Sequence, residues 1–291
     1  MEAPKPGFLG NLTPEQENML EELKKRVAEY TEKRVAEGME LTEVQKELLE
    51  MDSMYLRFLR GRKWDLEASY NSYIETAEWR RNFQGIGVDN IDETMIENEL
   101  KTGKCFMYKY DKRNRTIIYV RPRFHDPNQN TTEEMDRFLV WMTELGRKML
   151  RPGVETGLVI YDMNGFGLSN MDYTQVKTQI RILESYYPES MGLTLIVNSP
   201  WLFSACWRLI KGWIDPVAAE KIKFISQAEL TQYVDPDNLL KDYGGNDPYQ
   251  FTYETVEERK ATGYIPPWEM SWATEWRQEE KAKAEADSPT E

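Results

Sequence analysis

Apolar residues recur at helical spacing along residues 13–79. Leu20, Leu23 and Val27 alternate there with charged residues, which is the pattern of helices that bury one face. The pattern therefore predicts an all-helical N-terminal subdomain, which we assign to residues 1–83.

Farther along the chain, short apolar runs alternate with helical patterns. The expected strands are residues 106–110, 116–121, 157–162, 193–197 and 222–225, and the expected helices are residues 133–150, 172–186 and 201–214. The first two strands flank a polar turn and so predict a hairpin. Strands that alternate with helices of this length indicate a mainly parallel sheet with helical cover. We assign this second domain to residues 84–250.

The predicted helix at residues 201–214 is apolar around most of its girth. Its polar residues Ser204, Arg208 and Lys211 are spaced four and then three apart, so they would form one narrow stripe. Such a helix is buried on several sides or faces something apolar. It could be a core helix, a membrane span or the wall of a cavity for a hydrophobic ligand. The interrupting polar residues argue against a span, which needs roughly 20 apolar residues.

Composition narrows the class of protein. The 291 residues are 40% hydrophobic and 12% aromatic, which is enough for a substantial core. The net charge of -13 argues against nucleic acid as a partner and against permanent electrostatic attachment to anionic lipid. Any membrane contact is therefore expected to be apolar, local or transient. The first residues show no signal-peptide pattern, so we expect a cytoplasmic protein.

Few residues are available for catalysis or metal binding. Cys105 and Cys206 lie in apolar company and are expected to be reduced, and two thiols with one histidine cannot build a zinc cluster. The single histidine, His125, is expected in a surface loop because proline and asparagine residues follow it. No GxSxG, P-loop or dinucleotide motif is present. The sequence therefore favours a function without a chemical step.

The last part of the chain combines tryptophans with a charged end. Trp268, Trp272 and Trp276 precede the segment EEKAKAEADSPTE. We interpret residues 251–291 as an arm that packs on the second domain, followed by a disordered tail.

Three separated segments carry a family resemblance: FLRGRKWDLEAS, YYPESMGLTLIVNSPWLFSACWRLIKGWIDPVAAEKI and AELTQYVDPDNLLKDYGG. In order and spacing they resemble the CRAL-TRIO lipid-binding proteins, especially the yeast-type phosphatidylinositol transfer proteins, over about residues 54–245. The resemblance implies an α/β fold, with a helical N-terminal subdomain and a CRAL-TRIO lobe. In that lobe a mainly parallel sheet floors a hydrophobic lipid pocket, which a gate helix closes.

The resemblance also implies roles for residues of the apolar helix. Residues 201–214 look like the mobile gate. Phe203, Trp207, Ile210 and Trp213 would then face acyl chains when the gate is closed and meet the membrane when it opens.

Headgroup contacts are carried over from the family residue by residue. Arg62 and Lys63 resemble the basic pair that the family places near the inositol phosphate, and Glu189 and Lys221 match its other polar contacts. Arginine and lysine suit a phosphodiester in a poorly hydrated site, and a carboxylate accepts hydrogen bonds from inositol hydroxyls. The alternative interpretation is a surface salt-bridge cluster.

The sequence departs from the family at both ligands. Ala218 stands where the phosphatidylinositol pattern usually has a threonine, so one hydroxyl contact to that headgroup is missing. Gly167, Met107 and Ile118 stand where the phosphatidylcholine site has hydroxyl-bearing residues and tyrosines. Ser169 is the one clear remnant of that site. We therefore expect phosphatidylinositol and a second hydrophobic lipid other than phosphatidylcholine.

The function that the resemblance implies is a phosphatidylinositol-binding lipid transfer or presentation protein, transiently peripheral to membranes and monomeric, with phospholipid as cargo and no cofactor. The first alternative is a lipid-sensing scaffold that regulates lipid signalling or vesicle trafficking and recruits a lipid kinase. The second is a carrier of a sterol, an isoprenoid or heme, where heme would need Tyr161 or Tyr173 as its axial ligand. A lipid hydrolase is disfavoured because neither Ser169 nor Ser199 has an evident histidine partner.

Overall fold

The computed structural model describes residues 5–276, and the chain divides into two compact units. The first unit contains the chain up to Ile91 and also Ile180–Ser190. The second contains Asp92–Gln179 and the chain from Met191 onward. The division into domains at residues 83 and 250 remains a prediction.

The first unit is helical, as its apolar spacing predicts. Its helices are α1 (Pro14–Ala36), α2 (Glu43–Glu50), α3 (Asp52–Gly61) and α4 (Leu66–Asn82), with short 3-10 helices at Phe83–Gly85 and Val88–Asn90. Thr13 caps α1, because its hydroxyl accepts a hydrogen bond from the backbone N–H of Gln16. Leu20, Leu23 and Val27 are buried, which confirms the predicted inward face of α1.

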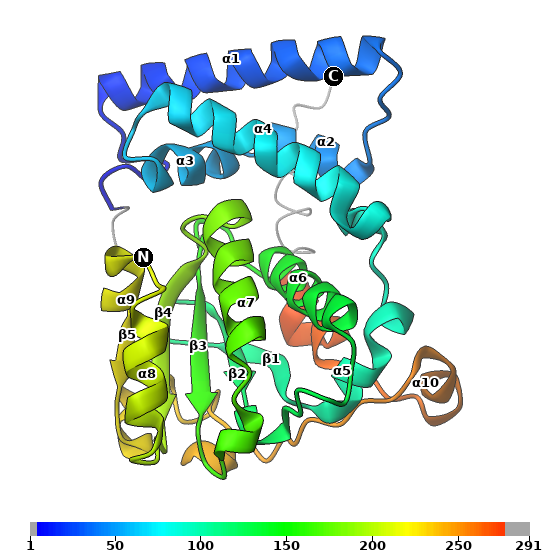
Figure 1. Cartoon of the computed structure of the whole chain (residues 1–291), viewed down its shortest axis with the longest axis vertical. Coiled ribbons are helices and arrows are strands. Elements are labelled where there is room, and N and C mark those ends of the chain that lie inside the picture. Colours follow the sequence, from blue (N-terminus) through cyan, green and yellow to red (C-terminus); the bar gives the residue numbers. More distant parts are fainter. Residues whose placement is uncertain (1–4, 277–291) are drawn as a thin grey trace, which may run out of the picture. The chain divides into compact units, whose positions relative to one another are not determined.

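The core of the first unit is aromatic. Helix α1 lies along α3 and α4 (Figure 1). Tyr55 of α3 stacks on Tyr73 of α4 with ring centroids 5.1 Å apart, and Phe58 meets the same ring edge-on. These contacts tie α3 to α4 and so fix the turn between the two helices.

The second unit contains one five-stranded sheet in the order β1-β2-β3-β4-β5. Its strands are β1 (Cys105–Tyr110), β2 (Thr116–Val120), β3 (Gly157–Asp162), β4 (Met191–Val197) and β5 (Ile222–Phe224). Strands β1 and β2 pair antiparallel, and the remaining pairs are parallel. The structure thus confirms the predicted hairpin and the mainly parallel sheet.

Helices connect and flank these strands. They are α5 (Glu97–Thr102), α6 (Thr132–Lys148), α7 (Tyr173–Tyr186), α8 (Phe203–Lys211), α9 (Pro216–Glu220) and α10 (Val256–Thr262), with 3-10 helices at Glu93–Ile96, Pro122–Phe124, Leu168–Asn170, Gln227–Gln232, Lys241–Tyr243 and Pro267–Glu269. Among the described residues, no helix has the length and apolar composition that a membrane span requires.

Helix α8 is shorter than the predicted span of 201–214. Its last turn tightens, because the N–H groups of Gly212 and Trp213 bond carbonyls three residues back. Asp215 then starts α9 as its N-cap. The predicted span of 201–214 therefore contains one helix, α8, with a turn at each end, and α9 follows that span.

One face of the sheet is closed by a packed core. Its side chains alternate along the strands and pack against segments that follow the last strand. The strand residues are Phe106, Tyr108, Ile117, Tyr119, Leu158, Ile160, Leu193, Leu195 and Val197, and the later residues are Leu230, Val234, Leu239, Leu240 and Tyr243.

The tryptophan-bearing arm packs on the second unit, as predicted. Trp272 meets Tyr108 and Tyr110 of β1 edge-on, with centroid distances of 5.4 and 5.5 Å. Trp268 meets Trp141 of α6 at 5.2 Å. The predicted disordered tail lies outside the described residues, from residue 277 onward.

Candidate functional site

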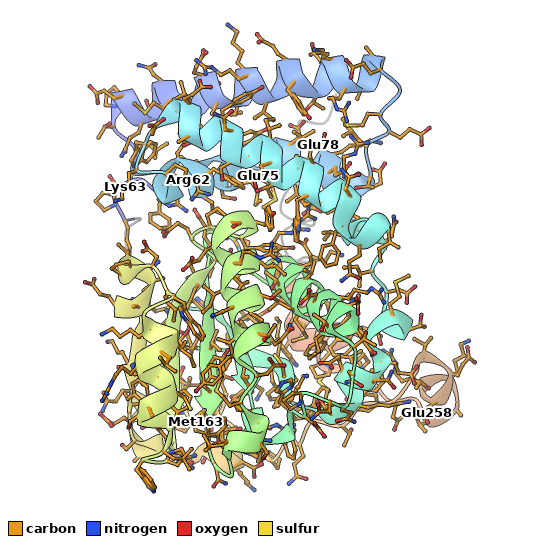
Figure 2. The ribbon with its side chains drawn as sticks, viewed as in Figure 1. Arg62, Lys63, Glu75, Glu78, Met163 and Glu258 are labelled. Atoms are coloured by element: carbon orange, nitrogen blue, oxygen red, sulfur yellow. The ribbon has the colours of Figure 1, made fainter. Side chains whose placement is uncertain are left out.

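The turn between α3 and α4 presents two of the predicted headgroup residues. Arg62 is the C-cap of α3, and Lys63 and Trp64 follow it with left-handed φ values of 53° and 63°. Non-glycine residues in this conformation are strained and tend to occur at functional sites. Figure 2 shows Arg62 and Lys63 side by side at this turn, and the Lys63 side chain is exposed.

The side chains of Arg62 and Lys63 differ in their contacts within the described residues. The guanidinium of Arg62 donates to the hydroxyl of Ser72 at 2.8 Å. Within residues 5–276, neither side chain forms an ion pair. In this part of the chain the two residues thus form no salt-bridge cluster, and their role as headgroup contacts stays a prediction.

Glu189 lies on a segment that packs against α3. A Cβ added at Gly61 would lie 3.0 Å from the Cβ of Pro188, so the two backbones approach closely. The hydroxyl of Ser190 accepts a hydrogen bond of 3.1 Å from Arg57. Glu189 itself has a left-handed φ of 56°. The first unit therefore holds three of the four predicted headgroup residues, at or beside the C-terminal half of α3.

Lys221 belongs to the second unit. It is the C-cap of α9 and immediately precedes β5. Its backbone N–H donates to Ala218, and its side chain is half-buried. The joint contribution of Lys221 and the three residues of the first unit to one site stays a prediction.

Helix α8 has a distinct inner face. Phe203, Cys206 and Ile210 are buried, as expected for a wall that faces the sheet. The rings of Phe203 and Trp207 lie 6.3 and 5.3 Å from that of Phe224 in β5. Helix α8 therefore covers the sheet at its β5 edge.

The outer face of α8 is both apolar and basic. The predicted stripe of Ser204, Arg208 and Lys211 is exposed, but so is Leu209, at 54%. Trp201, just before the helix, is 87% exposed. Residues 200–225 carry four basic and two acidic side chains, although the whole chain has a net charge of -13. An anionic apolar surface would suit this face.

The ring of Trp213 packs against the start of α7. Its ring lies edge-on to Tyr173 at 5.9 Å, and the ammonium of Lys177 lies 4.5 Å from its centroid. The side chain is half-buried. The contacts of Trp213 therefore join the turn after α8 to the N-terminal part of α7.

The other face of the sheet carries two rows of side chains across all five strands. Paired residues in neighbouring strands point to the same side. One row is Cys105, Val120, Tyr161, Ile196 and Phe224, and the other is Met107, Ile118, Val159, Thr194 and Ile222. Helix α6 approaches Met107 on this face, since a Cβ at Gly146 would meet its Cε at 3.0 Å. Helix α8 approaches Phe224.

Several residues in these rows are only partly buried. Burial raises the pKa of the Tyr161 hydroxyl and of the Cys105 thiol to about 12. Both side chains nevertheless keep accessible surface, as do Ile118 and Val159. Packing therefore does not bury this face completely. We call the two rows the floor, which is apolar apart from Cys105, Tyr161 and Thr194.

The residues singled out for the second ligand are divided between two settings. Met107 and Ile118 are register partners within one row, so apolar groups occupy the floor there. Ser169 is exposed in the 3-10 helix after β3, and Gly167 precedes it. A ligand contact by Ser169 stays a prediction.

His125 lies in a loop after the 3-10 helix Pro122–Phe124, as predicted, but its side chain is half-buried rather than exposed. Its Nδ1 lies 3.1 Å from the Lys104 ammonium, and its Nε2 lies 3.7 Å from an Asp172 carboxylate oxygen. Lys104 also pairs with the buried Glu99. Burial and the Lys104 charge lower the pKa of His125. These partners are distant in the sequence, so periodicity gave no signal for the cluster.

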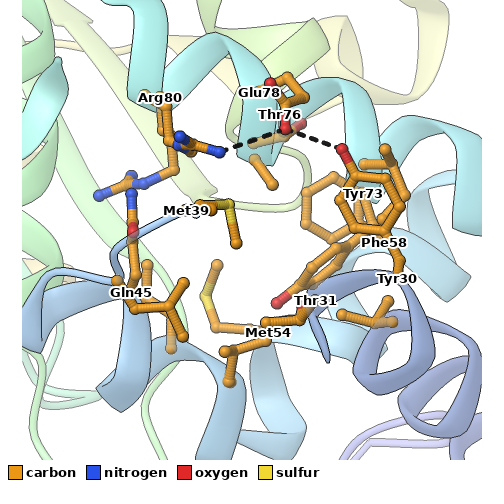
Figure 3. A pocket seen from close by; sticks show the side chains of 17 residues that line it. Tyr30, Thr31, Met39, Gln45, Met54, Phe58, Tyr73, Thr76, Glu78 and Arg80 are labelled. Atoms are coloured by element: carbon orange, nitrogen blue, oxygen red, sulfur yellow. Dashed lines mark hydrogen bonds and ion pairs between the residues drawn. The ribbon is translucent and has the colours of Figure 1, made fainter. Parts of the chain in front are cut away.

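The helical unit contains a cavity of about 70 Å³ that the sequence analysis did not predict (Figure 3). Residues of α1 to α4 line it, including Phe58 and Tyr73. At its polar side, Glu78 accepts a hydrogen bond of 2.7 Å from Tyr30 and pairs with Arg81 at 3.6 Å. Ligand pockets usually measure roughly 300–1,000 Å³, so this cavity is too small for a lipid.

The described residues contain no group of histidine, cysteine, aspartate or glutamate side chains that could hold a metal ion. Both cysteines are free thiols, as predicted. The described residues thus provide an apolar sheet face in the second unit and basic side chains at the turn after α3 in the first unit.

Comparisons with known proteins find matching family models in both units. The chain matches the CRAL/TRIO domain over residues 100–245 and the CRAL/TRIO N-terminal domain over residues 19–75.

Three curated proteins illustrate the similarity to known sequences. A CRAL-TRIO domain-containing protein of Schizosaccharomyces pombe is 40% identical over 69% of this chain and 47% of its own length. The phosphatidylinositol transfer protein CSR1 of Eremothecium gossypii is 34% identical over 69% of this chain and 48% of its own length. The chain thus spans about half the length of these two relatives. The SEC14 cytosolic factor of Kluyveromyces lactis is 31% identical, covering 97% of this chain and 91% of that protein.

The crystal structure of Sfh5 is similar, with a TM-score of 0.63 and 16% identity over 93% of this chain and 98% of that one. At this identity the likeness shows the fold alone.

Proposed function

Because the chain belongs to the CRAL/TRIO family, whose members bind lipids and are not enzymes, we propose that it carries phosphatidylinositol between membranes or presents it to other proteins. The lipid would leave a bilayer with its acyl chains on the floor of the second unit. Its headgroup would meet Arg62, Lys63, Glu189 and Lys221.

The observation that carries this proposal is the partly accessible apolar face of the sheet. An ordinary core would bury Ile118, Val159 and Tyr161 completely, as it does their neighbours on the opposite face. Apolar side chains in a central sheet stay accessible at a free-energy cost of about 25 cal/mol per Å². A hydrocarbon ligand would remove that cost.

The size of the hydrophobic effect makes such a carrier useful. Burial of each methylene is worth about 0.8 kcal/mol, so the transfer of a diacyl lipid from a bilayer into water costs on the order of tens of kcal/mol. Spontaneous exchange between bilayers is slow for that reason. A protein that keeps both chains enclosed lowers this barrier.

Phosphatidylinositol as the cargo is supported by the turn after α3. The Lys63 ammonium is exposed and forms no ion pair within the described part of the chain. The neighbouring guanidinium of Arg62 is oriented by Ser72. A phosphodiester takes hydrogen bonds from both kinds of cation. A relative whose name states phosphatidylinositol transfer supports the same cargo.

Transient membrane contact is supported by the outer face of α8. Trp201 and Leu209 offer exposed apolar area, and Arg208 and Lys211 add local positive charge. An acidic chain with such a patch would touch anionic bilayers locally and leave them again. We place the protein in the cytoplasm and at membrane surfaces as a monomer.

A transfer assay tests the cargo. The purified chain is mixed with donor vesicles that contain labelled phosphatidylinositol or labelled phosphatidylcholine, and transfer to acceptor vesicles is followed. We expect transfer of phosphatidylinositol and not of phosphatidylcholine. Lys63→Ala combined with Lys221→Ala should abolish phosphatidylinositol transfer and leave the circular dichroism spectrum unchanged.

The matched control is Lys25→Ala combined with Lys148→Ala, which removes two exposed lysines from α1 and α6. It should transfer phosphatidylinositol at the unaltered rate. Equal transfer by both double variants would contradict the headgroup assignment, and robust phosphatidylcholine transfer would contradict the proposed selectivity.

A further inference from the structure

The floor of the second unit has one hydrogen-bonding hydroxyl without a partner. Tyr161 is in β3, the central strand, with Val120 and Ile196 beside it in its row. Within residues 5–276 its hydroxyl forms no hydrogen bond. The only other hydroxyl in the two rows, that of Thr194, lies 3.2 Å from the sulfur of Met191 and is buried.

A phenol among apolar neighbours gains free energy when it finds an acceptor, because the other side chains of its row offer none. Burial raises the pKa of Tyr161 to about 12, so the phenol stays protonated and can donate at every physiological pH. The rest of its row is apolar or, at Cys105, only weakly polar. The floor therefore offers one donor in the middle of a hydrocarbon surface.

The chemistry of the floor defines what can satisfy this donor. A charged group would be poorly solvated among these side chains, since neither row contains an aspartate, glutamate, lysine, arginine or histidine. An uncharged oxygen accepts the hydrogen bond at no such cost. Resting on the proposed lipid-carrying function, we infer that Tyr161 donates a hydrogen bond to an uncharged oxygen of the bound lipid and selects lipids that place one there.

Two lipid groups supply this oxygen: an ester carbonyl of a phospholipid, and the hydroxyl of a compact neutral lipid such as a sterol. Both present one acceptor flanked by hydrocarbon. The experiment below distinguishes them, because each has a close analogue that lacks the oxygen.

The test measures dissociation constants of the full chain for four probes by displacement of a fluorescent phospholipid. The probes are ester-linked phosphatidylinositol, its ether-linked analogue, cholesterol and cholestane. Tyr161→Phe removes only the hydroxyl. We expect it to weaken binding of the ester-linked lipid or of cholesterol by roughly 3- to 10-fold, and to leave the analogue without the oxygen unchanged. If the variant separates the ester-linked from the ether-linked lipid, the oxygen is the ester carbonyl. If it separates cholesterol from cholestane, the oxygen is the hydroxyl of a neutral lipid.

The control variant is Tyr119→Phe, which removes a tyrosine hydroxyl from β2 on the packed face of the same sheet. It should change none of the four constants. Unchanged binding by Tyr161→Phe, or equal weakening for all four probes, would overturn the inference, because a packing role does not depend on the lipid oxygen. If the unaltered chain binds none of the probes, the proposed function itself fails.

Discussion

The ammonium of Lys177 lies 4.5 Å from the ring centroid of Trp213. Tyr173, one turn earlier in α7, meets the same ring edge-on at 5.9 Å. Trp213 belongs to the turn that follows α8, so these contacts join the end of α8 to α7. Movement of α8 away from the sheet would have to break them.

This contact predicts that Lys177 slows lipid exchange. An exposed cation–π contact is worth about 0.5–1 kcal/mol, so Lys177→Gln should speed phosphatidylinositol exchange by roughly 2- to 5-fold. The equilibrium lipid content should not change, because the barrier alone is lowered. Stopped-flow measurement of lipid exchange checks the rate.

Lys25→Gln is the control for this prediction, since it removes an exposed lysine from α1. Exchange that is equally fast in both variants would show a general charge effect. An exchange rate in Lys177→Gln that equals the unaltered rate would show that the contact does not hold α8 in place.

Trp201 should anchor the protein to bilayers. Its side chain is 87% exposed, so it contributes little to folding. Burial of an aromatic side chain in a membrane is worth about 1.5–3 kcal/mol, and Trp201→Ser should weaken binding to anionic vesicles at least roughly 10-fold. The melting temperature should stay the same. Vesicle sedimentation and calorimetry measure the two quantities.

Val35→Ser is a matched control, because Val35 is also exposed but lies in α1. It should bind vesicles as the unaltered chain does. If Trp201→Ser binds equally well, the membrane contact lies elsewhere.

His125 should make the stability depend on pH. Burial and Lys104 lower its pKa below the ordinary 6.5, so the unfolded chain takes up the proton more readily. The unfolding free energy should therefore fall as the pH drops from 6.5 toward the pKa of the folded state. Asp172 and Glu99 oppose this shift but do not cancel it.

His125→Gln should remove this part of the pH dependence, because glutamine does not titrate. Urea unfolding of both proteins between pH 7 and about pH 5, the range in which histidine titrates, measures the difference. Parallel stability curves over that range would contradict the assigned shift.

Periodicity predicted the sheet and the buried face of α1, because those depend on local alternation of apolar side chains. The end of the helix at residues 201–214 was harder to predict. Gly212 and Trp213 continue the apolar pattern, whereas the hydrogen bonding tightens there and Asp215 starts a new helix. Apolar spacing does not report such a change in hydrogen bonding.

Tertiary contacts explain what the sequence could not show. The sequence did not predict that His125 is half-buried, because its neighbours Lys104 and Asp172 are distant in the chain. Likewise, Tyr161 alternates like any strand residue, and its free hydroxyl emerges only when the register of β2, β3 and β4 is known. The headgroup residues were identified by family resemblance rather than by pattern, and the strained turn at Lys63 adds an independent observation.

Native mass spectrometry of the purified full chain, followed by lipid extraction, tests the central claim most directly. We predict a mass increase that corresponds to one phospholipid per chain, identified after extraction as phosphatidylinositol. Loss of this adduct on Lys63→Ala with Lys221→Ala would connect it to the headgroup residues. A chain that is empty as purified and stays empty after incubation with phosphatidylinositol vesicles would contradict the account.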